Sequence, residues 1–198
     1  MTMPRHEITR ADILPMREYA AIRKDQRRRM TEVKRQRRVA VGPYSTFYFE
    51  SYDTMWHQIH EMLFIEKGGD AQIQDELDAY NPLIPNGSEL VATVMFEIDD
   101  PARRSSVLFS VGGIENHMLL SVGGRTIRGL PDLTRENTSE DGKASSVQFI
   151  RFPLTADEKA QFIAGDVPVM VGFDHPHYGH LALIPPAVRQ SLAVDLTV

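Results

Sequence analysis

The sequence contains no cysteine in its 198 residues. This absence excludes disulfide bonds, thiolate zinc sites, cysteine nucleophiles and an iron–sulfur cluster of the protein's own. No apolar run approaches the roughly 18 residues that a membrane span requires, and the first ten residues lack the apolar stretch of a signal peptide. We therefore expect a cytoplasmic protein without membrane association.

Motifs of common enzyme classes are also absent. The chain has no G-x-G-x-x-G segment, no P-loop and no G-x-S-x-G nucleophile elbow, so no sequence signature points to phosphate binding or serine hydrolysis. Hydrophobic residues make up 42% and charged residues 25% of the chain, which is ordinary for a globular protein. The chain is long enough to bury a substantial core.

Charge is distributed unevenly along the chain. The net charge is −5, yet residues 1–38 hold twelve Lys or Arg against five Asp or Glu, a balance of +7, and the remainder carries −12. The cations gather in one predicted helix, which runs from Pro15 to about Arg38. They are Arg23, Lys24, Arg27, Arg28, Arg29, Lys34, Arg35, Arg37 and Arg38.

Such a helix has three physical uses. It could bind nucleic-acid phosphates, it could bind an acidic surface of its own chain, a second copy or another protein, or it could be a solvated face. The acidic remainder would repel a polyanion and argues against nucleic acid. We expect protein docking or self-association, through Arg27, Arg28, Lys34, Arg35 and Arg38.

The pattern of turns and apolar runs predicts an α+β protein. An N-terminal helical segment with the long basic helix should be followed by a mostly antiparallel sheet with short helices. Two short strands flank Gly42-Pro43, and Asp53 is a good N-cap for a helix over 54–66. We expect a helical arm and layer over 1–85 and a sheet domain over 86–198, or one continuous domain.

A first polar group surrounds the start of the helix over 54–66. It comprises Glu50, Asp53, His57, Gln58, His60 and Glu61. His57 and Glu61 lie one helical turn apart and could both bind one metal ion. The order His-x-x-His-Glu is neither HExxH nor HxxEH, and the alternative is a hydrated helix face.

A second polar group, Asp174-His175-Pro176-His177-Tyr178-Gly179-His180, is predicted to form a turn between two strands. If it met the first group, His57, Glu61, His175 and His177 could bind a divalent metal, since histidine and carboxylate are the strong ligands available. The alternative is an Asx turn with solvated imidazoles. A candidate polar site would combine Glu50, Asp53, Gln58, Glu61, Asp174, His175 and Tyr178.

Several segments occur together and in order along nearly the whole chain: ITRADILP, RRRMTEVKRQRRVAVGP, FESYDTMWHQIHEMLFIE, LDAYNPLIP, SVQFIRFPLT and DHPHY. Together they resemble the bacterial family called domain of unknown function 3501. The family-like positions are Glu50, Asp53, Thr54, Gln58, Glu61, Asp174, His175, Pro176 and Tyr178. His57, His60, His177 and His180 lie outside the pattern, which weakens a metal site built on them.

The resemblance implies no established activity. Genes of this family often lie beside those for rubrerythrin and an iron–sulfur oxidoreductase, which implies a role in peroxide or oxygen defence. We expect an accessory or protein-interaction factor in a redox or oxidative-stress pathway, with those two proteins as partners. The alternatives are a metal-dependent enzyme or metal-binding protein that uses the carboxylate and histidine residues, and nucleic-acid binding through the basic helix.

Overall fold

The basic helix, α1 (Met16–Arg35), follows directly after Pro15. A computed structural model describes residues 5–197 of the chain. The helix ends at Arg35, so the prediction that it continues to Arg38 is wrong. Arg38 instead begins strand β1 (Arg38–Val41) and pairs with Tyr48 in strand β2 (Ser45–Phe49), because backbone pairing and the β-branched residues of β1 favour the extended form.

Helix α2 (Tyr52–Glu66) begins earlier than the sequence suggests. Its N-cap is Ser51, not the predicted Asp53. The Ser51 hydroxyl accepts from the Thr54 N–H, and the Thr54 hydroxyl accepts from the Ser51 N–H at 2.8 Å. This reciprocal capping box satisfies two backbone donors, whereas Asp53 lies inside the first turn.

Short helices and 3-10 segments connect the other elements. The helices are α3 (Gln72–Tyr80), α4 (Pro101–Ser110), α5 (Ala156–Ala164) and α6 (Pro186–Ala193). The 3-10 segments are η1 (Arg10–Asp12), η2 (Gly69–Ala71), η3 (Asn81–Leu83), η4 (Ile114–His117) and η5 (Val194–Leu196). Across residues 5–197, no helix is long and apolar enough to cross a membrane.

The strands form two antiparallel sheets. After β1 and β2 come β3 (Glu89–Phe96), β4 (Met118–Val122), β5 (Arg125–Arg128), β6 (Leu130–Pro131), β7 (Val147–Pro153), β8 (Val169–His175) and β9 (Tyr178–Leu183). One sheet has the order β1-β2-β3-β7-β6 and the other β5-β4-β8-β9. The predicted α+β class is confirmed, with the strands divided between two sheets.

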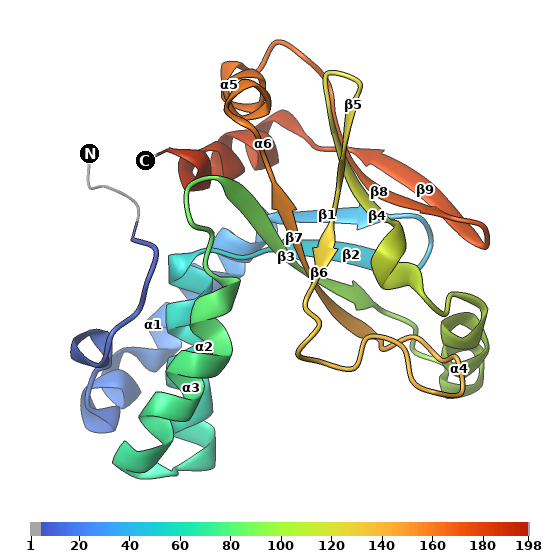
Figure 1. The fold of residues 1–198 in the computed structure, drawn as a ribbon. Coiled ribbons are helices and arrows are strands. Elements are labelled where there is room, and N and C mark those ends of the chain that lie inside the picture. The colour runs from blue at the N-terminus through green and yellow to red at the C-terminus, as the bar shows by residue number, and fades with distance from the viewer. Residues whose placement is uncertain (1–4, 198) are drawn as a thin grey trace.

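The main hydrophobic core lies between the two sheets (Figure 1). Phe47 from one sheet contacts Phe173 from the other, with ring centroids 5.2 Å apart, and it also packs near Phe152 at 6.4 Å. All three side chains are almost fully buried. Alternation along each strand directs these side chains to the inner face.

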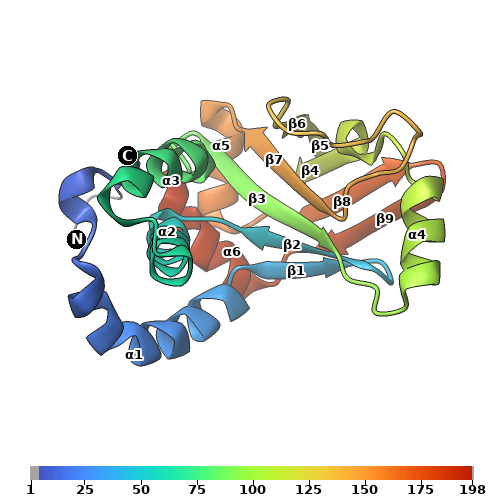
Figure 2. The ribbon, with the colours of Figure 1, turned by 90° about the horizontal axis from the view of Figure 1, so that it is seen from below.

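A second core lies beneath the N-terminal helices. Ile59, Leu63 and Leu77 from α2 and α3 pack with Val91, which points to the outer face of β3. Helix α1 lies along the other side of α2, so that α1, α2 and α3 gather at one end of the molecule (Figures 1 and 2). Strand β2 pairs with β3, which joins strands from residues 1–85 and 86–198 in one sheet.

Candidate functional site

Two ion pairs attach α1 to α2, one on each side of the seam between these helices. Arg23 donates two hydrogen bonds of 2.8 Å to the carboxylate of Glu61, and Arg29 pairs with Asp53. Tyr19 and Met30 of α1 are buried between them. The family-like carboxylates Asp53 and Glu61 therefore position α1 on the body of the protein.

The Arg23–Glu61 pair extends into a small network. The Tyr19 hydroxyl donates to Glu61 at 2.7 Å and lies 3.2 Å from Nδ1 of His57. Hydrogen bonds from Arg23 and Tyr19 lower the pKa of Glu61 to about 2, although burial opposes the shift. Burial lowers the pKa of His57, and burial together with Glu61 raises the pKa of Tyr19. The carboxylate stays ionised and the phenol protonated, as in a structural ion pair.

The cations of α1 that form no ion pair with α2 lie on one side of the helix and are here called the basic stripe. It consists of Arg17, Lys24, Arg27, Arg28, Lys34 and Arg35. Residues seven apart on a helix point in nearly the same direction, which aligns Arg17 with Lys24, Arg27 with Lys34, and Arg28 with Arg35. All but the half-buried Lys34 are exposed.

Few carboxylates neutralise the basic stripe. Asp25 pairs with Arg28 at 2.9 Å and Glu32 pairs with Arg35 at 2.9 Å, both within α1. Within residues 5–197, Arg17, Lys24, Arg27 and Lys34 have no carboxylate within salt-bridge distance. Of the predicted docking residues, Arg27, Arg28, Lys34 and Arg35 belong to the stripe, whereas Arg38 is exposed on β1.

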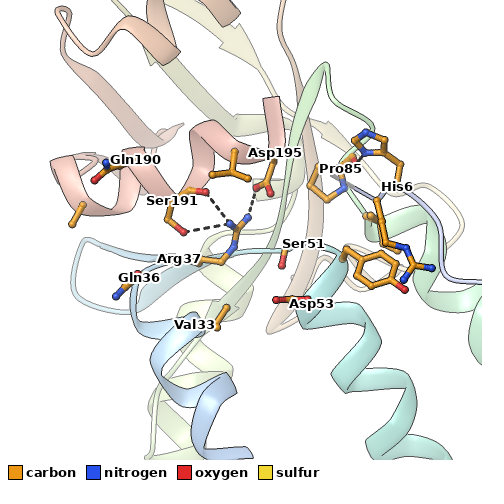
Figure 3. A pocket seen from close by; sticks show the side chains of 15 residues that line it. His6, Val33, Gln36, Arg37, Ser51, Asp53, Pro85, Gln190, Ser191 and Asp195 are labelled. Atoms are coloured by element: carbon orange, nitrogen blue, oxygen red, sulfur yellow. Dashed lines mark hydrogen bonds and ion pairs between the residues drawn. The ribbon is translucent and has the colours of Figure 1, made fainter. Parts of the chain in front are cut away.

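Arg37, which the sequence places in the basic helix, forms the floor of a separate pocket of about 740 Å³ (Figure 3). Its guanidinium is buried and donates to the carbonyl oxygens of Phe49, Glu50 and Ser191 at 3.0, 2.8 and 3.2 Å, and it pairs with Asp195. Burial raises the pKa of Asp195, and the charge of Arg37 opposes this effect. The guanidinium is fully used in holding the C-terminal segment against β1.

The other charges around this pocket are also compensated within the protein. Arg5 pairs with Asp12 and Asp53 pairs with Arg29, while Nδ1 of His6 lies 2.6 Å from the Pro85 carbonyl oxygen. A charged ligand would meet no uncompensated Lys, Arg, Asp or Glu among the described lining residues. The pocket therefore gives weaker support to a function than the basic stripe does.

The side chains of the remaining members of the first polar group either form hydrogen bonds within the fold or form none. Glu50 is buried and accepts hydrogen bonds of 2.6 Å from the hydroxyls of Thr54 and Thr93. The side chain of Gln58, in α2, makes no hydrogen bond within the described part of the chain. Both ring nitrogens of His60 are occupied: Nε2 accepts from the Leu14 N–H at 3.0 Å, so Nδ1–H donates to the Trp56 carbonyl at 2.7 Å.

The second polar group is mostly strand rather than turn. Strand β8 continues through His175 and β9 begins at Tyr178, so the predicted turn over 174–180 is confined to Pro176-His177. The reason is that Tyr178 is anchored in the core. Its hydroxyl accepts from the N–H groups of Tyr44 and Ser45 at 3.0 and 3.1 Å and donates to the Val41 carbonyl at 2.9 Å.

Asp174 and His175 point to different partners. Asp174 accepts from His117 at 3.1 Å and pairs with Arg128. Burial raises the pKa of Asp174, but the hydrogen bonds and charges of Arg128 and His117 together outweigh it and lower the pKa below its ordinary value. Nδ1 of His175 accepts from the His177 N–H at 3.2 Å, leaving Nε2–H to donate to the Gly112 carbonyl at 3.3 Å. Sequence reasoning missed His117, because only the β4–β8 register places it beside Asp174.

The structure does not bring the two polar groups together. The β8–β9 turn and helix α2 lie at opposite ends of the molecule in both views (Figures 1 and 2). The combined site of Glu50, Asp53, Gln58, Glu61, Asp174, His175 and Tyr178 is therefore wrong, as is a metal site shared by His57, Glu61, His175 and His177. Among residues 5–197, no group of three or more His, Asp or Glu could hold a metal ion.

Comparisons with known proteins agree with the resemblance found in the sequence. A family model described as "Protein of unknown function (DUF3501)" matches residues 7–196. A crystal structure of a novel protein of unknown function from Burkholderia pseudomallei K96243 is 40% identical, with a TM-score of 0.89 over 96% of this chain and 98% of that chain. No curated protein matches. The chain therefore belongs to the DUF3501 family.

Proposed function

We propose that this protein is an interaction factor whose basic stripe binds an acidic surface of another protein. The observation that carries this proposal is the position of Arg17, Lys24, Arg27 and Lys34 on one side of α1, without carboxylate partners among the described residues. Cations held on a packed helix lose less freedom on binding than cations on a disordered tail. Their charge would also accelerate association with an acidic partner.

A protein partner fits this surface better than a nucleic acid does. Residues 39–198 carry a net charge of −12, which would repel a second polyanion. Carboxylates at Glu18, Asp25 and Glu32 run along α1 beside the stripe, again at seven-residue spacing. Phosphates on a long duplex would meet this acidic row, whereas a compact acidic patch on a protein would avoid it.

The pathway proposed for this interaction is redox or oxidative-stress defence, with rubrerythrin and an iron–sulfur oxidoreductase as the first partners to test. The support is the gene neighbourhood implied by the family resemblance, which is associational. An acidic patch on the partner would supply the counter-charges for the cations on α1.

The test measures binding of purified rubrerythrin and of the oxidoreductase to the full chain by biolayer interferometry, at low and high salt. The variant Lys24→Glu/Arg27→Glu reverses two charges that lack carboxylate partners, and Arg125→Glu/Arg151→Glu is a matched control with the same change in net charge on exposed strand residues. We expect the stripe variant to weaken binding about tenfold or more, and the control to change it little.

Three results would contradict the proposal. They are absence of binding to both proteins at low salt, equal weakening by the two variants, and binding that salt does not affect. Tight, salt-dependent binding of duplex DNA with no binding of either protein would support the nucleic-acid alternative instead.

A further inference from the structure

We propose that the binding segment of the partner combines carboxylates with one apolar anchor residue, and that the anchor enters a cleft at the start of α1. This inference rests on the proposed function and specifies the partner's chemistry. It follows from a second cavity, which adjoins the basic stripe and has a different lining.

The cleft, here called the anchor cleft, has a volume of about 380 Å³. Its apolar lining comes from the residues before and at the start of α1 and from helices α2 and α3: Ile13, Leu14, Pro15, Met16, Leu63 and Ile73. Arg10 and Asp70 form a salt bridge at its rim. A cavity of about 150 Å³ accommodates a benzene ring, so the cleft has room for a leucine or phenylalanine side chain.

A second, cationic cavity lies farther along α1 than the anchor cleft. This cavity of about 490 Å³ is lined by Ala20, Arg23, Lys24, Arg27, Arg28, Thr31 and Phe64. Met16 and Ala20 are one turn apart on the same face of α1, and Leu63 and Phe64 are adjacent in α2. The two cavities therefore follow one another along these helices, apolar first and cationic next.

The spacing sets the length of the partner segment. Met16 and Arg28 lie twelve residues apart, which is about 18 Å along a helix. An extended segment of about five or six residues would span this distance, or a helix of about twelve. We expect carboxylates within that length on one side of the anchor.

Charge complementarity identifies the occupant as an acidic protein segment. Lys24 and Arg27 are exposed and have no carboxylate partner among the described residues, so carboxylates would supply the missing counter-charges. A phosphodiester backbone would match the cations but has no aliphatic group for the cleft. A protein segment provides both.

The test uses three fluorescent peptides with the full chain: one leucine followed by six glutamates, the same peptide with serine in place of leucine, and one leucine followed by six glutamines. The protein variants are Met16→Gln, which makes the cleft lining polar without changing charge, and Lys24→Glu/Arg27→Glu. Fluorescence anisotropy measures affinity, circular dichroism checks folding, and sedimentation velocity measures self-association.

We expect the leucine–glutamate peptide to bind wild type about tenfold more tightly than the serine peptide, as burial of one leucine side chain implies. This preference should disappear in Met16→Gln. Both acidic peptides should bind Lys24→Glu/Arg27→Glu weakly, and the glutamine peptide should bind weakly to every protein.

Failure of the anchor cleft and failure of the proposed function would give different results. Equal binding of the leucine and serine peptides, lost on stripe reversal, would overturn the anchor cleft but leave the proposed function standing. Peptide binding that stripe reversal does not change would overturn both. A wild-type dimer that dissociates on stripe reversal would show that the occupant is a second copy of this chain, and would overturn the inference.

Discussion

At the scale of single residues, the carboxylate of Glu61 links the basic helix to the body. It accepts two hydrogen bonds from Arg23 and one from Tyr19. Hydrogen bonds to a charged, largely buried group are among the stronger ones in proteins. The orientation of the basic stripe therefore depends on a residue that lies outside it.

Replacing Glu61 with Gln should reduce the free energy of unfolding by about 2 kcal/mol at pH 7. The pKa of Glu61 is about 2 in the fold against an ordinary value of 4.5, so ionised Glu61 stabilises the fold above about pH 4.5. This contribution is lost as the pH falls toward 2. Urea unfolding at pH 7, 5 and 3 should show that the difference in free energy of unfolding between wild type and Glu61→Gln narrows as the pH falls. Glu66→Gln is the exposed control. A difference that stays constant with pH would contradict this role of Glu61.

Tyr178 is a second residue whose role only the structure explains. Three backbone groups of the β1–β2 turn depend on its hydroxyl. Tyr178→Phe should destabilise the protein by about 1–3 kcal/mol, because it leaves these groups without their partner. Tyr80→Phe is the matched control, since the Tyr80 hydroxyl makes no hydrogen bond within residues 5–197. Similar urea midpoints for the two variants would argue against this role.

At the scale of elements, the sequence predicts most helices and strands but not all of their boundaries. The two short strands around Gly42-Pro43 lie where predicted, because the chemistry of a turn is local. The predicted C-terminal end of α1 and the predicted start of α2 are wrong. Arg38 is drawn out of the helix because it pairs with Tyr48 in β2. This partner is ten residues away, so the local pattern around Arg38 does not reveal it.

The start of α2 gives a direct test of capping. Ser51→Ala should lower the free energy of unfolding by about 1 kcal/mol, because it removes the side chain that accepts from Thr54. Asp53→Ala should cost less, since Asp53 lies in the first turn and its pair with Arg29 is exposed to solvent. Thermal unfolding measures the stability of both variants. A larger loss of stability in Asp53→Ala than in Ser51→Ala would indicate that Asp53 is the N-cap.

At the scale of the whole molecule, the buried pair of Arg37 and Asp195 connects the C-terminal segment to the first sheet. Asp195→Asn would leave the Arg37 guanidinium buried without its counter-ion, at a cost of about 3–5 kcal/mol. Asp157→Asn, which removes an exposed partner 4.0 Å from Arg125, is the control and should change little. Equal unfolding midpoints for the two variants would exclude a stabilising role for the buried pair.

The candidate site shows where sequence reasoning ends. Charge asymmetry and helical spacing are properties of neighbouring residues, so the sequence predicts the basic helix that carries Arg27, Arg28, Lys34 and Arg35, whereas a docking role for them stays a prediction. Whether Glu61 approaches His175 depends on how two sheets and three helices pack, and local pattern does not encode that arrangement. The structure separates them and pairs Glu61 with Arg23 instead.

The central claim is that the basic stripe contacts carboxylates of a protein partner. Carbodiimide cross-linking tests it most directly, because this reagent joins a lysine amine to a carboxylate in contact, without a spacer. The chain has five lysines, of which Lys24 and Lys34 lie in the stripe and Lys67, Lys143 and Lys159 lie elsewhere. Mass spectrometry of the complex with rubrerythrin or the iron–sulfur oxidoreductase should locate the cross-links at Lys24 and Lys34; cross-links confined to the other three lysines would contradict the claim.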